Sequence, residues 1–231
     1  KAKDRIIDDA KRGGQNQRAL FKETIYTPGV DFVGEVLSAW LAEMACRANR
    51  TTDMASLDQV LTAQPTWFSP LLGIDDLPDA YRGIPIHDQD VRAALVAVYC
   101  TSLCRWLFCP ARAMLFGLSA AVIHFNRKPT LVVASARRLF GVAATAFFDD
   151  ICRITSSSSE DSDERSLNLL LSKFGSPPAP QKTSPLGQSR VWIGVCINLA
   201  RCLDEGVYEL KPTESAVAAV TTGCLQAIER S

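Results

Sequence analysis

The chain has 231 residues, of which 47% are hydrophobic, and its 25 basic side chains balance 25 acidic ones. This size allows one sizeable core, either as one domain with a subdomain or as two small domains. The neutral balance excludes a global positive field, so any contact with nucleic acid must come from local patches. No apolar run is as long as a membrane span, and we expect no membrane partner. The chain starts without Met, and we expect it to be a piece of a longer polypeptide.

Eight cysteines lie at irregular spacing, mostly within apolar stretches. We expect them to be reduced and buried, and to act as small hydrophobic residues. Cys100, Cys104 and Cys109 contain no CxxC pair, so the sequence supports a zinc site only weakly.

The N-terminal part combines a basic segment with helical patterns. Residues 5–9 predict a short strand, and residues 1–22 hold seven Lys or Arg against three Asp. This is the one strongly basic segment that we identify; it suits phosphate contact, and a solvated charged face gives the same pattern. Apolar residues at helical spacing predict a helix over 30–48, and a shorter one over 56–63 ends before Pro65.

The middle of the chain predicts strands and then a long helix. Residues 67–77 form an apolar strand that ends on Asp75 and Asp76. A turn at 87–90 leads into a strand at 91–99, which we expect to complete a hairpin, and 106–108 is a short third strand. Residues 119–140 predict a helix with Ser119 as N-cap, and Pro129 kinks or restarts it.

The last third alternates strands and helices. Residues 142–148 and 151–154 predict a hairpin with Asp149 and Asp150 in its turn. The Ser-rich run 156–163 predicts a solvated loop, followed by a helix at 165–174. A strand at 191–198 is expected to pair with 207–210, and a final helix spans 213–230. This alternation predicts an α+β fold, an antiparallel sheet with its helices gathered on one face.

Two pairs of carboxylates therefore stand at strand ends. Oxygen ligands on a rigid sheet suit hard divalent cations. Aspartate is also a preferred turn residue, and most Asp-Asp turns bind nothing, so a purely structural role is the alternative.

Three motifs in chain order resemble the palm motifs of reverse transcriptases. They are DLPDAYRGIPI at 76–86, LFGLS at 115–119 and FFDD at 147–150, and the Phe-Gly-Leu is similar to the tyrosine-recombinase and gypsy-type retrotransposon enzymes. Residues 5–9 resemble the fingers strand, and Lys182 followed by VWIGV at 191–195 resembles the later lysine and primer grip. The resemblance implies a right-hand polymerase palm with partial fingers. Its parts would be partial fingers at 1–66, a palm at 67–211 with a fingers insertion around 88–115, and the start of a thumb or a C-terminal helix at 212–231.

The resemblance implies an RNA-directed DNA polymerase that uses two Mg²⁺ ions, with Mn²⁺ as the alternative, to transfer a nucleotide from a dNTP to a primer 3′-hydroxyl. Asp76, Asp149 and Asp150 would hold the metals. Asp76 is preferred to Asp75 because Tyr81 stands at the family's offset from it, and because Asp75 would point to the opposite face of the strand.

The resemblance also implies a nucleotide site. Tyr81 would lie under the sugar and exclude a 2′-hydroxyl, although outside the motif it would be an ordinary half-buried aromatic. Arg5, and more weakly Lys3, would bind the triphosphate.

The remaining roles concern the template and the leaving group. Phe116 and Gly117 would approach the templating pair, where glycine permits close contact, unless Gly117 simply starts the helix. Lys182 would protonate the pyrophosphate, with a solvated lysine as the alternative. His87 and His124 are expected to be structural.

The sequence departs from the family at Leu115, where many relatives have Pro, and at Phe148, where Tyr is commoner. Compared with the family, we expect less of the fingers before Arg5 than a full enzyme needs, a single helix after Leu210 where a thumb should follow, and no RNase H segment. The implied partners are an RNA or DNA template with its primer, dNTPs and the remainder of a retroelement polyprotein. A decayed or domesticated palm that binds nucleic acid or protein without polymerising is the alternative, and Tyr81 disfavours an RNA-synthesising palm.

Overall fold

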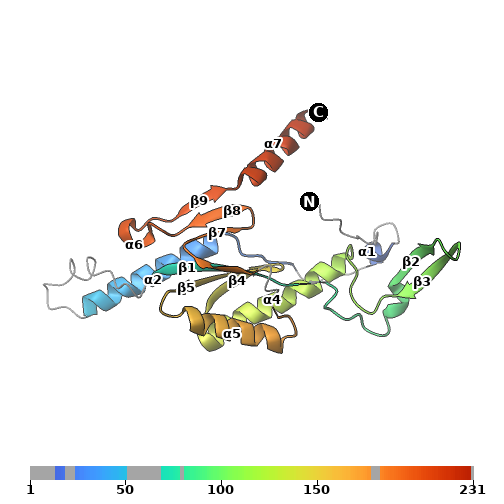
Figure 1. Ribbon diagram of the computed structural model, residues 1–231, viewed down its shortest axis with the longest axis horizontal. Coiled ribbons are helices and arrows are strands. Elements are labelled where there is room, and N and C mark those ends of the chain that lie inside the picture. The colour runs from blue at the N-terminus through green and yellow to red at the C-terminus, as the bar shows by residue number, and fades with distance from the viewer. Residues whose placement is uncertain (1–13, 19–23, 51–68, 79–80, 178–182, 230–231) are drawn as a thin grey trace.

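The computed structural model describes residues 14–18, 24–50, 69–78, 81–177 and 183–229. The fold is mixed α/β with antiparallel sheets, as the sequence predicts for the class (Figure 1). In chain order the elements are α1 (Gln15–Arg18), α2 (Asp31–Arg50), β1 (Pro70–Asp76), the 3₁₀ turn η1 (Val91–Ala93), β2 (Leu95–Cys100), β3 (Arg105–Pro110), α4 (Ser119–Phe140), β4 (Ala143–Phe147), β5 (Asp150–Ser156), α5 (Glu160–Lys173), β6 (Ser184–Gly187), β7 (Ser189–Trp192), β8 (Val195–Asn198), α6 (Cys202–Glu205), β9 (Glu209–Pro212) and α7 (Glu214–Glu229).

The central sheet has the strand order β4-β5-β1-β6, with antiparallel neighbours throughout. Strand β1 pairs with β5 over its whole length, from Pro70 opposite Ser156 to Asp76 opposite Asp150. The β4–β5 hairpin confirms the strands predicted on either side of the Asp-Asp pair. Because strand residues alternate between faces, each strand contributes side chains to both sides of the sheet.

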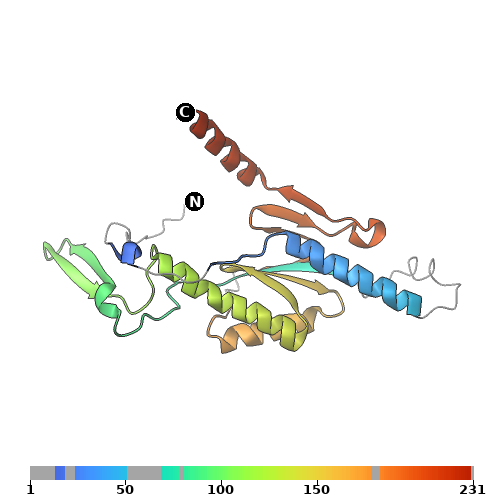
Figure 2. The ribbon, with the colours of Figure 1, turned by 180° about the vertical axis from the view of Figure 1, so that it is seen from behind.

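Both faces of this sheet are covered. On one face α4 and α5 pack against β4 and β5, with Val132, Leu171 and Ile151 in a shared core. On the other face α2 contributes Val33 and Leu37 to a second core, which also holds Leu72, Ile74, Cys152, Ile154, Trp192 and Ile197. The expectation that the helices gather on one face is therefore wrong. The strands are apolar on both sides, so each side requires a covering layer, which Figure 2 shows as α2 on one side of the sheet and α4 and α5 on the other.

The C-terminal strands form a separate antiparallel sheet in the order β7-β8-β9. The predicted single strand at 191–198 is in fact two strands, because Ile193 (φ 43°) and Gly194 (φ 80°) turn the chain back. The predicted pairing with 207–210 is confirmed in part, since β8 pairs with β9 and Ile197 lies opposite Leu210. Helix α7 confirms the predicted final helix and extends away from the sheets (Figure 1).

Strands β2 and β3 form a two-stranded ribbon that projects from the body of the molecule (Figure 1). The sequence predicts that strand β2 forms a hairpin with the segment before the turn at 87–90, and the structure shows a different partner. Residues 91–93 are a 3₁₀ turn, and β2 pairs with β3 from Leu95 opposite Pro110 to Cys100 opposite Arg105. The segment before the turn makes only an isolated bridge, between Pro85 and Ala113. Proline has no N–H to donate to a ladder, which disfavours a strand there.

The Ser-rich segment after β5 is not the solvated loop that was predicted. Strand β5 continues to Ser156, which is buried, and α5 begins at Glu160. The Thr155 hydroxyl donates to Asp163 Oδ2 at 2.5 Å, and Ser156 and Ser159 pair their hydroxyl groups. Acidic side chains in the first turn of a helix are stabilised by its dipole, so this polar run begins α5.

The cysteines are all free, as expected, but they are not all buried. Cys152 and Cys202 are buried, and burial raises the pKa of the Cys152 thiol to about 12. Cys46, Cys104, Cys109 and Cys224 are exposed instead. Within the described residues, no helix combines the length and apolar character that a membrane crossing requires.

Candidate active site

The backbone brings the two Asp-Asp pairs to the same edge of the central sheet. Asp76, the last residue of β1, lies directly opposite Asp150, the first residue of β5. The Leu77 N–H donates to the Asp149 carbonyl at 2.9 Å. The expectation that these acids meet on neighbouring strand ends is therefore confirmed for the backbone. The turn itself consists of Phe148 and Asp149, so Asp150 begins the strand rather than lying in the turn.

Asp75 and Asp76 have different surroundings. Asp75 is buried, and it lies opposite Ile151, on the face of the sheet that α4 and α5 cover. Burial raises the pKa of Asp75, while the nearby Arg153 guanidinium and a hydrogen bond from Thr183 lower it. Arg153 is itself buried, so Asp75 compensates its charge inside the protein. Asp76 is half-buried and, because strand residues alternate, lies on the other face of the sheet. Its role as a metal ligand stays a prediction.

The turn that carries Asp149 has an unusual backbone. Phe148 adopts a left-handed conformation with φ 53°, which a bulky side chain rarely does. Its ring packs edge-to-face on Phe147, with ring centroids 5.0 Å apart. Conformations of this kind cluster at functional sites, where the surrounding structure over-determines them.

Tyr81 links the second and third motifs. Its ring packs edge-to-face on Phe116 at 4.9 Å and on the buried Phe125 of α4 at 5.4 Å. Burial raises the pKa of Tyr81, and the negative charge of Asp149 raises it further. Tyr81, Phe116 and Asp149 come from three separate motifs of the sequence, and they are neighbours in the fold.

Asn16 holds the turn that contains Gly117. Its Nδ2 donates to the Gly117 carbonyl at 2.9 Å, and its Oδ1 accepts hydrogen bonds from the Ser119 N–H at 2.8 Å and from the Ser119 hydroxyl at 3.1 Å. Gly117 has φ 110°, which a residue with a side chain rarely adopts. Ser119 is thus not the N-cap that was predicted. Leu118 occupies that position without a side-chain bond, and Asn16 supplies the cap from outside the helix.

We expect the substitution Asn16→Ala to lower the free energy of unfolding by about 1 kcal/mol, because it removes the side-chain acceptor that caps the start of α4. Urea denaturation monitored by circular dichroism measures this change. Gln17→Ala is the matched control, since Gln17 is an exposed neighbour in α1. Equal stability of both variants would show that the cap contributes nothing.

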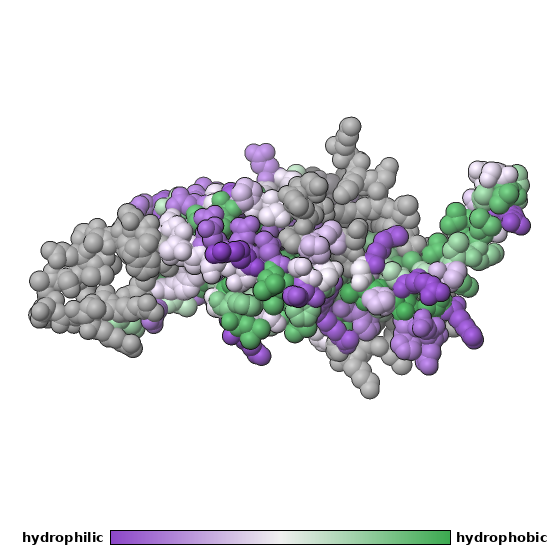
Figure 3. Space-filling view, turned by 60° about the horizontal axis from the view of Figure 1, so that its bottom comes forward, coloured by the Kyte–Doolittle hydropathy of each residue, from purple (hydrophilic) through white to green (hydrophobic). Residues whose placement is uncertain are grey.

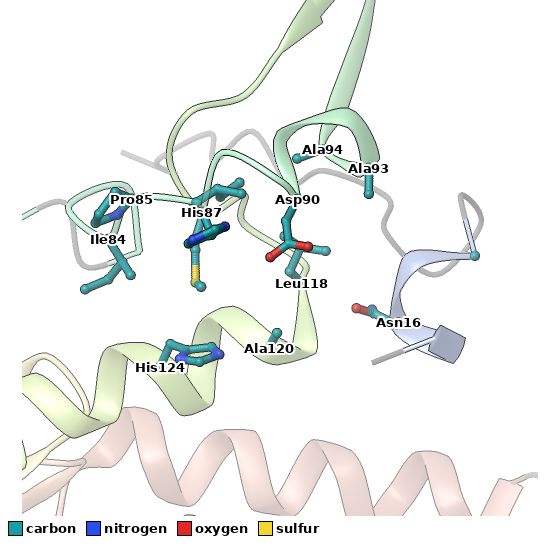
Figure 4. Close-up of a pocket in the computed structure, with 13 residues that line it drawn as sticks. Asn16, Ile84, Pro85, His87, Asp90, Ala93, Ala94, Leu118, Ala120 and His124 are labelled. Carbon is teal, nitrogen blue, oxygen red and sulfur yellow. The ribbon is translucent and has the colours of Figure 1, made fainter. Parts of the chain in front are cut away.

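A cavity of about 680 Å³ lies beside this turn, at the base of the ribbon. Figure 4 shows His87 and Asp90 on one side of it, His124 and Ala120 of α4 opposite them, and Asn16 at the end of the helix. Both histidines of the chain line this cavity. His87 Nδ1 accepts from the Gln89 N–H at 3.3 Å, and His124 Nδ1 lies 3.2 Å from Arg127 Nη1.

The carboxylates provide oxygen donors only, which is the donor type that Mg²⁺ and Mn²⁺ prefer. The backbones of Asp76 and Asp150 are adjacent, and the donor chemistry fits a hard divalent cation. In the described part of the chain, no three Asp, Glu, His or Cys side chains converge closely enough to hold a metal ion as they stand. Lys3, Arg5 and Lys182 lie outside the described residues, as do the predicted strand at 5–9 and the helix at 56–63.

Comparison with known proteins identifies no relative of this chain. No protein-family model matches the chain, and no curated protein matches it. The structure defines a mixed α/β domain with an antiparallel sheet that presents acidic residues at one edge.

Proposed function

We propose that this chain is the palm, with part of the fingers, of a retroelement reverse transcriptase. One observation carries the proposal: Asp149 lies next to the end of β1 through the Leu77–Asp149 hydrogen bond, and its charge also acts on Tyr81. The three motifs that resemble a palm thus occupy one region of the molecule.

The proposed reaction is nucleotidyl transfer from a dNTP to a primer 3′-hydroxyl on an RNA template. Asp76, Asp149 and Asp150 would hold Mg²⁺, which when bound would polarise phosphate oxygens and neutralise charge that develops in the transition state. The chain's own contribution is a rigid sheet edge that holds carboxylates in place. Phe116 and the Gly117 turn, fixed by Asn16, would shape the side of the site that faces the templating base.

Primer extension tests this function. The 231-residue chain is incubated with an RNA template, an annealed DNA primer and Mg²⁺, with either dNTPs or rNTPs. We expect extension with dNTPs and little with rNTPs. A folded chain that binds primer–template but extends nothing with Mg²⁺ or Mn²⁺ would support the non-catalytic palm instead.

We expect Tyr81→Ala to raise ribonucleotide incorporation relative to deoxyribonucleotide incorporation by roughly tenfold to a hundredfold. Removing the ring opens space where a 2′-hydroxyl would otherwise clash. Single-nucleotide extension with matched dNTP and rNTP measures the ratio. Tyr81→Phe is the control, because it keeps the ring and should keep the selectivity. Unchanged selectivity in a folded Tyr81→Ala variant would remove Tyr81 from the nucleotide site.

A further inference from the structure

The β2–β3 ribbon has one face rich in exposed aromatic rings. The ladder places Tyr99 opposite Trp106 and Ala97 opposite Phe108, so all three aromatic side chains lie on the same face. Their side chains are exposed to 47% (Tyr99), 59% (Trp106) and 66% (Phe108). In Figure 3 the projecting end of the ribbon, at the right edge, is largely hydrophobic with hydrophilic groups at its tip.

Two of the aromatic rings on this face pack against each other. Tyr99 and Trp106 pack edge-to-face with ring centroids 5.4 Å apart, which fixes one ring against the other. On the opposite face of the ribbon Val96 and Leu107 are half-buried, whereas Val98 is exposed. A two-stranded ribbon is only marginally stable alone, and a contiguous apolar patch at the surface marks a binding site.

The charge around the ribbon indicates what binds there. Residues 91–148 contain no Asp or Glu and carry seven basic side chains, so residues 1–22 are not the one strongly basic segment of the chain. The basic residues are Arg92, Arg105, Arg112, Arg127, Lys128, Arg137 and Arg138. The first three flank the ribbon or lie within it, and all three are exposed. Two carboxylates, Asp88 and Asp90, lie in the turn just before the ribbon, so residues 87–112 carry three arginines against two aspartates. This small positive excess favours an anionic partner.

We propose that the aromatic face of the β2–β3 ribbon binds single-stranded nucleic acid. Bases would stack on Trp106 and Phe108, which stand two residues apart and are therefore separated by about 6.8 Å, enough for each ring to take its own base. Arg92 and Arg112, which flank the ribbon, would attract the phosphates, whereas Arg105 lies on the opposite face of the ladder. A duplex hides the faces of its bases, so only an unpaired strand offers them to these rings. Such stacking needs neither a metal ion nor a polymerase reaction.

Fluorescence anisotropy tests this assignment with labelled oligo(dT) and oligo(rU) 12-mers, without dNTPs or divalent ions. We expect the double variant Trp106→Ala/Phe108→Ala to bind at least about 25-fold more weakly than wild type, from a loss of roughly fivefold per ring. Trp106→Phe should keep most of the affinity. Val98→Ala is the matched control, because Val98 is 52% exposed on the opposite face of the same ribbon. An abasic oligonucleotide of equal length should bind wild type and the double variant alike.

One result would overturn the assignment: equal oligonucleotide affinity of wild type and a folded double variant. If that variant also lost self-association in sedimentation, the aromatic face would be a protein interface instead. Preference for oligo(rU) or oligo(dT) identifies the type of strand. A chain that extends no primer but binds oligonucleotides through these rings would refute only the polymerase function.

Discussion

The substitution Asp149→Asn is expected to reduce primer extension by about 10³-fold or more, because it removes a negative charge from the proposed metal site, where charge stabilisation is worth several kcal/mol. Asparagine has nearly the same size and is also a favoured turn residue, so the Phe148–Asp149 turn should persist. The free energy of unfolding is therefore expected to stay within about 0.5 kcal/mol of wild type. Steady-state extension rates with Mg²⁺ and urea denaturation provide the two measurements.

Asp88→Asn is the matched control for this experiment. Asp88 is an exposed aspartate in the turn that precedes the ribbon, and the same chemical change there should leave extension unaltered. If Asp149→Asn extended primers at the wild-type rate, Asp149 would not hold a catalytic metal and the polymerase proposal would fail. If both variants lost activity together, the effect would come from net charge rather than from the sheet edge.

The substitution Phe125→Ala is expected to lower the free energy of unfolding by about 3–5 kcal/mol, since it leaves a cavity in the core between α4 and the central sheet. Phe125 is 2% exposed and belongs to the same cluster as Val132, Leu171 and Ile151. Its ring also supports Tyr81 at 5.4 Å. Urea denaturation with a fitted m-value measures the change in stability.

Phe140→Ala, in the same helix, is the control, because Phe140 is 44% exposed and its loss should cost much less. Comparable destabilisation by the two substitutions would contradict the placement of Phe125 in the core. In a Phe125→Leu variant, which retains most of the apolar volume, ribonucleotide selectivity should weaken even though the fold persists, because Tyr81 loses one of its two ring contacts.

Local pattern predicted the long elements well. The predicted helix 119–140 coincides with α4, and the chain leaves it at Gly141, which takes the left-handed C-cap conformation with φ 70°. The helix continues without interruption through the buried Pro129, so it neither ends nor restarts there. The two strands around the Asp-Asp pair were also predicted, because a β-prone apolar run interrupted by turn residues has few other structures available.

Pairing between distant segments was predicted less well. The predicted partner of β2 was wrong, because the alternation of apolar residues indicates that a segment is a strand but does not indicate which strand it pairs with. The position of α2 on the second face was also missed, since an amphipathic helix presents the same pattern whichever face it covers. Lys3, Arg5, Lys182 and the division into fingers and palm stay predictions, as does membership of the reverse transcriptase family.

By itself, the sequence determined the positions of the long helices α2, α4 and α7, the two strands around the Asp-Asp pair, and the α+β class of the chain. Only the tertiary structure decided that Asp76 lies opposite Asp150, that Asp149 affects Tyr81, and that Asn16 caps a helix 103 positions away. Element boundaries follow from interactions within a few residues, which the local pattern contains. Register and long-range contacts depend on which surfaces pack together, and that depends on the whole chain at once.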